Sequence, residues 1–195
     1  MIIFVKSTDD MKKLFFAAFI AMMLSACGRT PEGACVIEGN VSLPEYGMMY
    51  LVGFDGTRID STSRADDGGF RFVYADSTSM PEVVVLEFRN PSVAADVMYL
   101  PVALEPGQVN VTLGEYIGLS GTPLNDEIKE FFDDMQALSD SFETEISTVE
   151  GMKAAYSAFY LRKMQENDGN VFGDYLKLAY ARELTVEDLE TLLGE

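Results

Sequence analysis

Histidine and tryptophan are both absent from the 195-residue sequence, and cysteine occurs only twice. Without an imidazole, the chain lacks an essential part of the Ser-His-Asp and Cys-His hydrolases, of His-ligated zinc sites and of His-ligated haem. Basic residues are scarce as well, since 14 lysines and arginines face 32 aspartates and glutamates, for a formal net charge of -18. Because such a chain repels phosphate backbones, we expect no nucleic-acid partner. A hydrophobic share of 48% is nevertheless ordinary for a chain that buries a core.

The first residues have the pattern of an export signal. Lys12 and Lys13 precede an uninterrupted apolar run over residues 14–24, which is too short for a permanent membrane-spanning helix. The run ends in Leu24-Ser25-Ala26-Cys27, which matches the lipobox of bacterial lipoproteins, where the cysteine thiol receives a diacylglycerol. The pattern predicts lipidation at Cys27, over the alternatives of an ordinary cleaved signal peptide or a buried apolar segment.

The flanking residues set the boundaries of this signal. Asp9 and Asp10 are unusual before a basic pair, so Met11 is predicted to be the true start. We expect residues 1–26 to be a signal peptide and residues 27–33 to be a lipid-anchored linker. The linker lacks the acidic run that resembles a surface-export signal of Bacteroidetes lipoproteins. The pattern therefore predicts a cell-envelope protein that is held at the membrane by its N-terminal lipid and faces the periplasm.

Lipidation would leave one free thiol in the chain. A thioether at Cys27 cannot form a disulfide, so Cys35 has no intramolecular partner. Cys35 begins an apolar, strand-like run, where it is expected to act as a small buried hydrophobic residue. The alternative is a reactive thiol, for which no nearby cysteine or histidine offers support.

Residues 34–121 alternate short β-type runs with turn residues. The runs are enriched in β-branched and aromatic residues, and no helical stretch of about ten residues interrupts them, which argues against a doubly wound parallel sheet. Asp66-Asp67-Gly68-Gly69 is expected to form a hairpin turn before residues 70–74. The pattern predicts an antiparallel β-sandwich of seven or eight strands, over residues 34–43, 48–54, 58–63, 70–74, 82–88, 97–104, 109–113 and 116–120.

After the strands, the hydrophobic period changes to that of helices. Thr122 is a candidate N-cap, with Pro123 at the first helical position. Thr185 and Asp188 resemble a capping box that opens a last short helix. The protein is thus predicted to be mainly β with α, and its C-terminal segment over residues 122–195 is expected to hold helices at residues 123–146, 152–167, 172–182 and 185–193.

Several short phrases line up along the chain, namely Ile37-Glu38-Gly39-Asn40-Val41, Asp60-Ser61-Thr62 before the Asp-Gly-Gly-Phe turn, Leu104-Glu105-Pro106-Gly107, Gly118-Leu119-Ser120-Gly121-Thr122 and Leu124-Asn125. Together they resemble the N-terminal domain of unknown function of Bacteroidetes lipoproteins of the thioredoxin and alkyl-hydroperoxide-reductase type. The resemblance covers roughly residues 34–121. The helices from 123 to 193 are similar to the connector that joins this domain to a thioredoxin-like domain.

No catalytic residue follows from this resemblance. In those relatives the redox chemistry is expected from a Cys-x-x-Cys motif in the following domain, and this sequence lacks the motif. We expect a non-enzymatic periplasmic lipoprotein that acts as a binding or interaction module. The alternative is an accessory or truncated half of a thiol-disulfide redox lipoprotein, whose partner would be a separate periplasmic protein or a thioredoxin-like domain.

Carboxylates are plentiful, but their pattern favours solvated surfaces over catalysis. A glycosidase-like hydrolase needs two carboxylates that face each other across a cleft and differ in pKa, which no local spacing here establishes. The acidic turns at 66–69 and 167–170 lack the spacing of an EF-hand, so we expect plain turns, no metal and no cofactor. Three acidic pairs are expected on the polar faces of helices, namely Asp133 with Asp134, Glu143 with Glu145, and Glu187 with Asp188.

Six aromatic residues lie on neighbouring expected strands. Alternation places most of them inward, so core packing is expected. The alternative is an exposed aromatic face that binds a sugar or a peptide. These residues are Tyr46, Tyr50, Phe54, Phe70, Phe72 and Tyr74.

Two short phrases resemble the O-glycosylation signature of exported Bacteroidetes proteins, namely Asp60-Ser61-Thr62 and Asp76-Ser77-Thr78. Ser61 or Ser77 is therefore a candidate glycan site near an expected loop edge. The alternative is that Asp60 and Asp76 form local turns with the following backbone amides. Intact-mass analysis of protein from its own membrane, with both serines replaced by alanine as the control, distinguishes the two.

Overall fold

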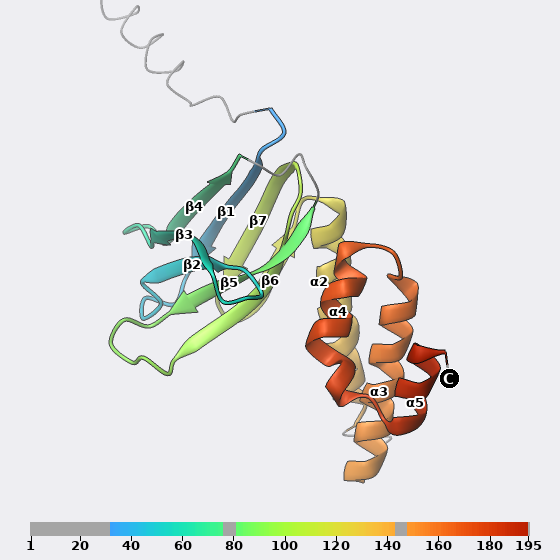
Figure 1. The fold of residues 1–195 in the computed structure, drawn as a ribbon. Coiled ribbons are helices and arrows are strands. Elements are labelled where there is room, and N and C mark those ends of the chain that lie inside the picture. The colour runs from blue at the N-terminus through green and yellow to red at the C-terminus, as the bar shows by residue number, and fades with distance from the viewer. Residues whose placement is uncertain (1–31, 76–80, 143–147, 195) are drawn as a thin grey trace, which may run out of the picture. The chain divides into compact units, whose positions relative to one another are not determined.

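Eight strands form two four-stranded sheets in the computed structural model, which describes residues 32–75, 81–142 and 148–194 (Figure 1). The first, called the β1 sheet, contains in order β4 (Gly69–Tyr74), β1 (Cys35–Val41), β7 (Gly107–Leu113) and β8 (Ile117–Ser120). The second, called the β2 sheet, contains in order β3 (Arg58–Ser63), β2 (Met48–Val52), β5 (Glu82–Arg89) and β6 (Val97–Leu104). The predicted β-sandwich followed by helices is confirmed.

Alternate residues of the strands build the core between the sheets. Ile37 and Val109 are opposite each other in the β1 sheet, Leu51 and Leu86 are opposite each other in the β2 sheet, and all four are almost fully buried. Every strand pair is antiparallel except β1 with β7, which run parallel. A parallel pair needs a long connection, and here the chain passes through five other strands between β1 and β7.

The turn at Asp66-Asp67-Gly68-Gly69 forms, but the predicted hairpin is wrong. Gly68 has a φ of 90°, in the left-handed region that glycine favours. Strands β3 and β4 on its two sides belong to different sheets, so the turn carries the chain from one sheet to the other. Asn40 Nδ2 donates to the carbonyl of Asp67 at 3.0 Å, and this bond holds the turn against the end of β1. Turn residues specify a chain reversal, but they do not specify which strands pair.

The helical segment follows the expected order. It consists of α2 (Pro123–Ser141), α3 (Val149–Glu166), α4 (Val171–Tyr180), a short 3-10 turn η1 (Ala181–Glu183) and α5 (Val186–Leu193). The N-cap at Thr185 is confirmed, because its hydroxyl accepts a bond from the Asp188 amide at 3.2 Å, but the reciprocal bond of a capping box is not made, since the Thr185 amide donates to the Ser157 hydroxyl at 2.6 Å. Thr122 occupies the N-cap of α2 with Pro123 after it, but its side chain does not cap the helix. Ile146, at the end of the first expected helix, lies outside the described residues.

A side-chain amide joins α2 to the edge of the β2 sheet. Asn125 is fully buried, and its Oδ1 accepts a bond from the backbone amide of Ala103 in β6 at 3.0 Å. Its Nδ2 donates to the carbonyl of the same Ala103 at 2.9 Å and to the Thr122 hydroxyl at 2.7 Å. The Asn125 amide therefore takes the place of a neighbouring strand on the edge strand β6, whose backbone groups would otherwise lack partners.

Glu105 completes this joint. Its carboxylate accepts a bond from the Leu124 amide at 2.7 Å, so it supplies the N-terminal cap that Thr122 does not. Gly121 has a φ of 122°, and a β-carbon there would lie 2.2 Å from the Gln108 carbonyl. Three of the phrases that carried the family resemblance thus meet at one joint between sandwich and helices.

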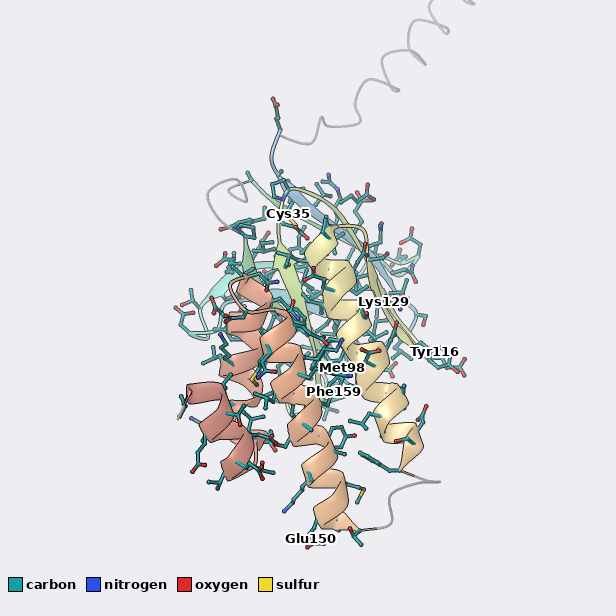
Figure 2. The ribbon with its side chains drawn as sticks, turned by 90° about the vertical axis from the view of Figure 1, so that its right-hand side faces the viewer. Cys35, Met98, Tyr116, Lys129, Glu150 and Phe159 are labelled. Carbon is teal, nitrogen blue, oxygen red and sulfur yellow. The ribbon has the colours of Figure 1, made fainter. Side chains whose placement is uncertain are left out.

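Aromatic packing holds the helices together and places α4 beside the sandwich. Phe131 of α2 is buried, and its ring centroid lies 5.4 Å from that of Phe159 in α3 and 5.9 Å from that of Phe172 in α4. Figure 2 shows Phe159 between the helices. Helix α4 in turn packs against β5 of the β2 sheet. This packing brings residues far apart in the sequence to the two sides of one groove.

Candidate functional site

A groove of about 510 Å³ lies between helix α4 and the β2–β3 turn of the sandwich. Figure 1 shows α4 beside the sandwich. The helix supplies Val171, Asp174, Tyr175 and Leu178 to this hollow, which we call the α4 groove. The sandwich side includes Phe54, Asp55, Ile59, Tyr74 and Glu82.

Apolar side chains line much of the α4 groove and are open to solvent. The Phe54 ring lies 5.2 Å from the Tyr175 ring, measured between centroids, and the two planes are inclined by 44°. Leu178 is 65% exposed and Phe54 is 44% exposed. Single exposed apolar residues are common on proteins, but several around one hollow are typical of a binding surface.

The polar part of the α4 groove is negative. Asp55 accepts two bonds from Thr57, one from its backbone amide and one from its hydroxyl, both at 2.8 Å. The bond from the Thr57 amide is the main reason that the pKa of Asp55 is lowered, so this carboxylate stays ionised. Glu82 accepts a bond from the Tyr74 hydroxyl at 3.4 Å, and Asp174 lies in the first turn of α4. Among the described lining residues there is no lysine or arginine.

The described residues offer no group of three or more histidine, cysteine, aspartate or glutamate side chains that could hold a metal ion. The lining of the α4 groove has two chemical features, an apolar, partly aromatic surface and carboxylates that accept hydrogen bonds. Either feature can contact a bound partner.

A second hollow, of about 390 Å³, lies between α2 and strands β6 and β8. Figure 2 shows Tyr116 projecting outward from the edge of the molecule beside it. Tyr116 is 79% exposed, and Tyr99 on β6 is also exposed. Here Lys129 forms an ion pair with Asp133, so the lining includes a cation as well as carboxylates. It lacks the one-sided charge of the α4 groove.

The six candidate aromatic residues divide between core and surface. Phe70 and Phe72 of β4 are buried, as alternation predicts, and Tyr46 is buried in the connection between β1 and β2. Phe54 is exposed: the buried residues of β2 are Met49 and Leu51, so Phe54 has the outward phase, and it lies in the turn beyond Val52. Tyr74 lines the α4 groove, and Tyr50 lies beneath Arg58, whose guanidinium carbon is 3.9 Å from the ring centroid.

Two of the acidic residues expected on solvated helix faces instead hold the helices together. Asp134 forms an ion pair with Lys163 at 2.7 Å, and the Lys163 side chain is only 10% exposed. Asp188 accepts a bond from the hydroxyl of the buried Ser157, which links α5 to α3. Asp133 and Glu187 are exposed, as predicted. Glu143 and Glu145 lie outside the described residues.

The second acidic turn is a turn, as predicted, and begins a helix. Asn170 Oδ1 accepts a bond from the Gly173 amide at 2.8 Å and so caps α4. Asp168 bonds to Lys177 at 2.7 Å, and this bond is the main reason that the pKa of Asp168 is lowered. The turn thereby fixes the start of the helix that forms one side of the α4 groove.

The predicted modification sites lie mostly beyond the described ranges. Cys27 and Ser77 are both outside them. Ser61 is exposed, but it lies within β3, at the edge of the β2 sheet, and not in a loop. The Asp60 carboxylate accepts a bond from the Ser61 amide at 2.7 Å, as in the local-turn alternative. The structure thus corrects the expected position of Ser61, and glycosylation stays a prediction.

Cys35 is fully buried in the core, as the sequence predicts (Figure 2). Burial is the largest of the effects that raise the pKa of its thiol to about 11. A thiolate is the nucleophile in disulfide exchange, so a thiol with a raised pKa stays protonated and unreactive near neutral pH. The position of Cys35 therefore gives no support to redox chemistry by this chain.

We expect Cys35 to resist thiol reagents in the folded protein. The full chain, purified in an uncharged detergent, should react with an aromatic disulfide reagent only after denaturant is added, because the native fold excludes both the reagent and the thiolate form. It should also reduce no insulin disulfides. Reductase turnover that Cys35→Ser abolishes would contradict this prediction.

The sequence-based predictions do not include the helix side of the α4 groove. The 172–182 helix resembles part of a connector, and this resemblance predicts no functional role for Asp174, Tyr175 or Leu178. A usable signal is the excess of apolar residues around α4, where Leu178 lies outside the buried stripe of Phe172 and Leu176. Leu178 indicates a binding surface only together with the other exposed apolar residues of the groove, Phe54 and Ile59.

Comparison with known protein families found none that matches this chain, and comparison with curated proteins found no relative. Within the described ranges, no helix has the length and apolar character that a bilayer-spanning segment requires.

Proposed function

We propose that the protein is a non-enzymatic lipoprotein of the periplasm that binds a partner through the α4 groove. The observation that carries this proposal is the groove itself, where exposed Phe54, Ile59 and Leu178 gather beside three carboxylates. An exposed apolar surface of this kind is costly to keep in water unless it is covered part of the time.

The anchor is the second part of the proposal. The lipobox at Cys27 supports attachment through lipid, and a formal net charge of -18 opposes binding to anionic head groups by the protein surface. A lipid anchor with a short linker would hold the sandwich and helices near the membrane and leave the α4 groove open to other envelope proteins. The resemblance to the accessory domain of thioredoxin-type lipoproteins is compatible with such a role, and the buried Cys35 favours binding over thiol chemistry.

Site-specific photo-crosslinking in the native host tests this binding function. A photoreactive amino acid at position 178 should give a discrete crosslinked species, because Leu178 is exposed at the groove. Leu193 on α5 is the matched control, since it is also a leucine on a helix and is 63% exposed, but it does not line the groove. Absence of a species at 178, or the same species at 193, would contradict the proposal.

A further inference from the structure

Building on the proposed binding function, we propose that the α4 groove takes a peptide segment in which a lysine or arginine is next to an apolar side chain. The charge of the groove is the first reason. Asp55, Glu82 and Asp174 all line it, and no lysine or arginine is among its described lining residues. Lys177 interacts with Asp174 from the next turn of α4, but it is paired with Asp168 and does not line the groove. The carboxylates of the lining therefore attract a positively charged group, and the attraction is stronger in a hollow than on an open surface.

The apolar lining is the second reason. Carboxylates alone would be enough to bind a cation, but the α4 groove also exposes the apolar side chains of Phe54, Ile59 and Leu178. An apolar side chain placed on these residues would remove both surfaces from water. The faces of Phe54 and Tyr175 also suit the methylene stem and the charge of a lysine or arginine.

The geometry disfavours a sugar. Sugar rings stack on flat aromatic platforms, whereas the Phe54 and Tyr175 rings are inclined by 44° and contact each other. The aliphatic side chains of Ile59, Val171 and Leu178 offer nothing to sugar hydroxyls, so that only the carboxylates could accept bonds from them. An anionic lipid surface is disfavoured by the same three carboxylates.

Three short peptides of equal length, each with a fluorescent dye, provide the test. All have a glycine and serine background, and their centres are Lys-Leu-Lys, Glu-Leu-Glu and Lys-Ser-Lys. Fluorescence anisotropy with the full chain in uncharged detergent should show binding of Lys-Leu-Lys. Glu-Leu-Glu and Lys-Ser-Lys should bind at least about tenfold more weakly, because each lacks one of the two complementary features. Binding of either control peptide as tightly as Lys-Leu-Lys would overturn the inference.

Matched variants assign the binding to the groove. Leu178→Ser should weaken Lys-Leu-Lys binding roughly tenfold, and Leu193→Ser should leave it unchanged. Asp174→Asn should weaken it about threefold, whereas Asp66→Asn removes an equal charge from an exposed turn and should have no effect. Equal losses in the two members of either pair would show general attraction to an acidic protein and overturn the assignment.

Other outcomes are distinguishable. If sedimentation shows that Leu178→Ser converts a dimer into a monomer, the occupant is a second copy of this chain and the peptide assignment is wrong. If crosslinking at position 178 succeeds and Lys-Leu-Lys does not bind, the binding function stands and the assigned chemistry fails. If neither experiment gives a signal, both proposals fail.

Discussion

Asn125→Ala is expected to lower the free energy of unfolding by about 3 kcal/mol, because it leaves two buried backbone groups without partners. The Asn125 amide makes three hydrogen bonds at a fully buried position, two of them to Ala103. Removing one partner of a buried bond costs the desolvation of the group that remains, and here both the amide and the carbonyl of Ala103 remain. Denaturant titration followed by circular dichroism measures the loss.

Asn40→Ala is the matched control for this change. Asn40 is exposed and its side-chain amide makes one bond, to the Asp67 carbonyl, so its loss should cost less than about 1 kcal/mol. Equal losses in the two variants would show that the amide of Asn125 has no special role at the edge of β6.

Asn125→Asp separates the hydrogen-bonding role from the shape of the side chain. A buried carboxylate next to the Ala103 carbonyl cannot donate, so the pKa of the new aspartate should be raised in the folded state. A group whose pKa is higher in the folded state loses its stabilising effect as the pH rises through that value. Relative to the wild type, the variant should therefore be least stable at neutral pH and regain stability as the pH falls and the acid can donate again.

Cys27→Ala is expected to move the protein out of the membrane fraction. Lys12, Lys13 and the apolar run over residues 14–24 indicate export, and Leu24-Ser25-Ala26 precedes the cysteine as in a lipobox. Without the thiol no diacylglycerol can be attached, and the acidic remainder of the chain has no affinity for anionic head groups. Fractionation after a high-salt wash should show nearly all of the wild type, and little of the variant, in the membrane pellet.

Cys35→Ala is the control for this experiment. It removes the other cysteine, which is buried in the core, and should leave the protein in the membrane pellet. Retention of Cys27→Ala in the washed membranes would show that lipid at this residue is not the anchor.

The residues that carried the family resemblance build the scaffold and do not line the groove. Leu104 to Gly107, Gly118 to Thr122 and Leu124-Asn125 meet where α2 joins the sandwich. Asn40 of the first phrase holds the turn at Asp67. None of these phrases contributes a described lining residue of the α4 groove. Within this chain, the residues that build the joint are therefore separate from those that line the α4 groove.

The sequence alone determined the elements. The seven or eight short β-type runs between turn residues became eight strands, and the change of period at Thr122 became the start of α2. The burial of Cys35 and the N-cap at Thr185 could also be predicted from the sequence, because each depends on neighbours within a few residues. Local periodicity and capping chemistry are properties of short segments, and such segments keep them in the folded protein.

Only the tertiary structure decided how the elements meet. The sequence of the turn at residues 66–69 predicts a hairpin, yet β3 and β4 belong to different sheets. The reason is that strand pairing depends on which apolar faces pack across the core. Phe54 follows the outward phase of β2, whose buried residues are Met49 and Leu51, and it lies beyond the end of the strand. Its ring meets Tyr175, more than a hundred positions along the chain, only because packing around Phe131 places α4 beside β5. The α4 groove depends on contacts between segments far apart in the sequence, and the pattern within a single segment does not predict such contacts.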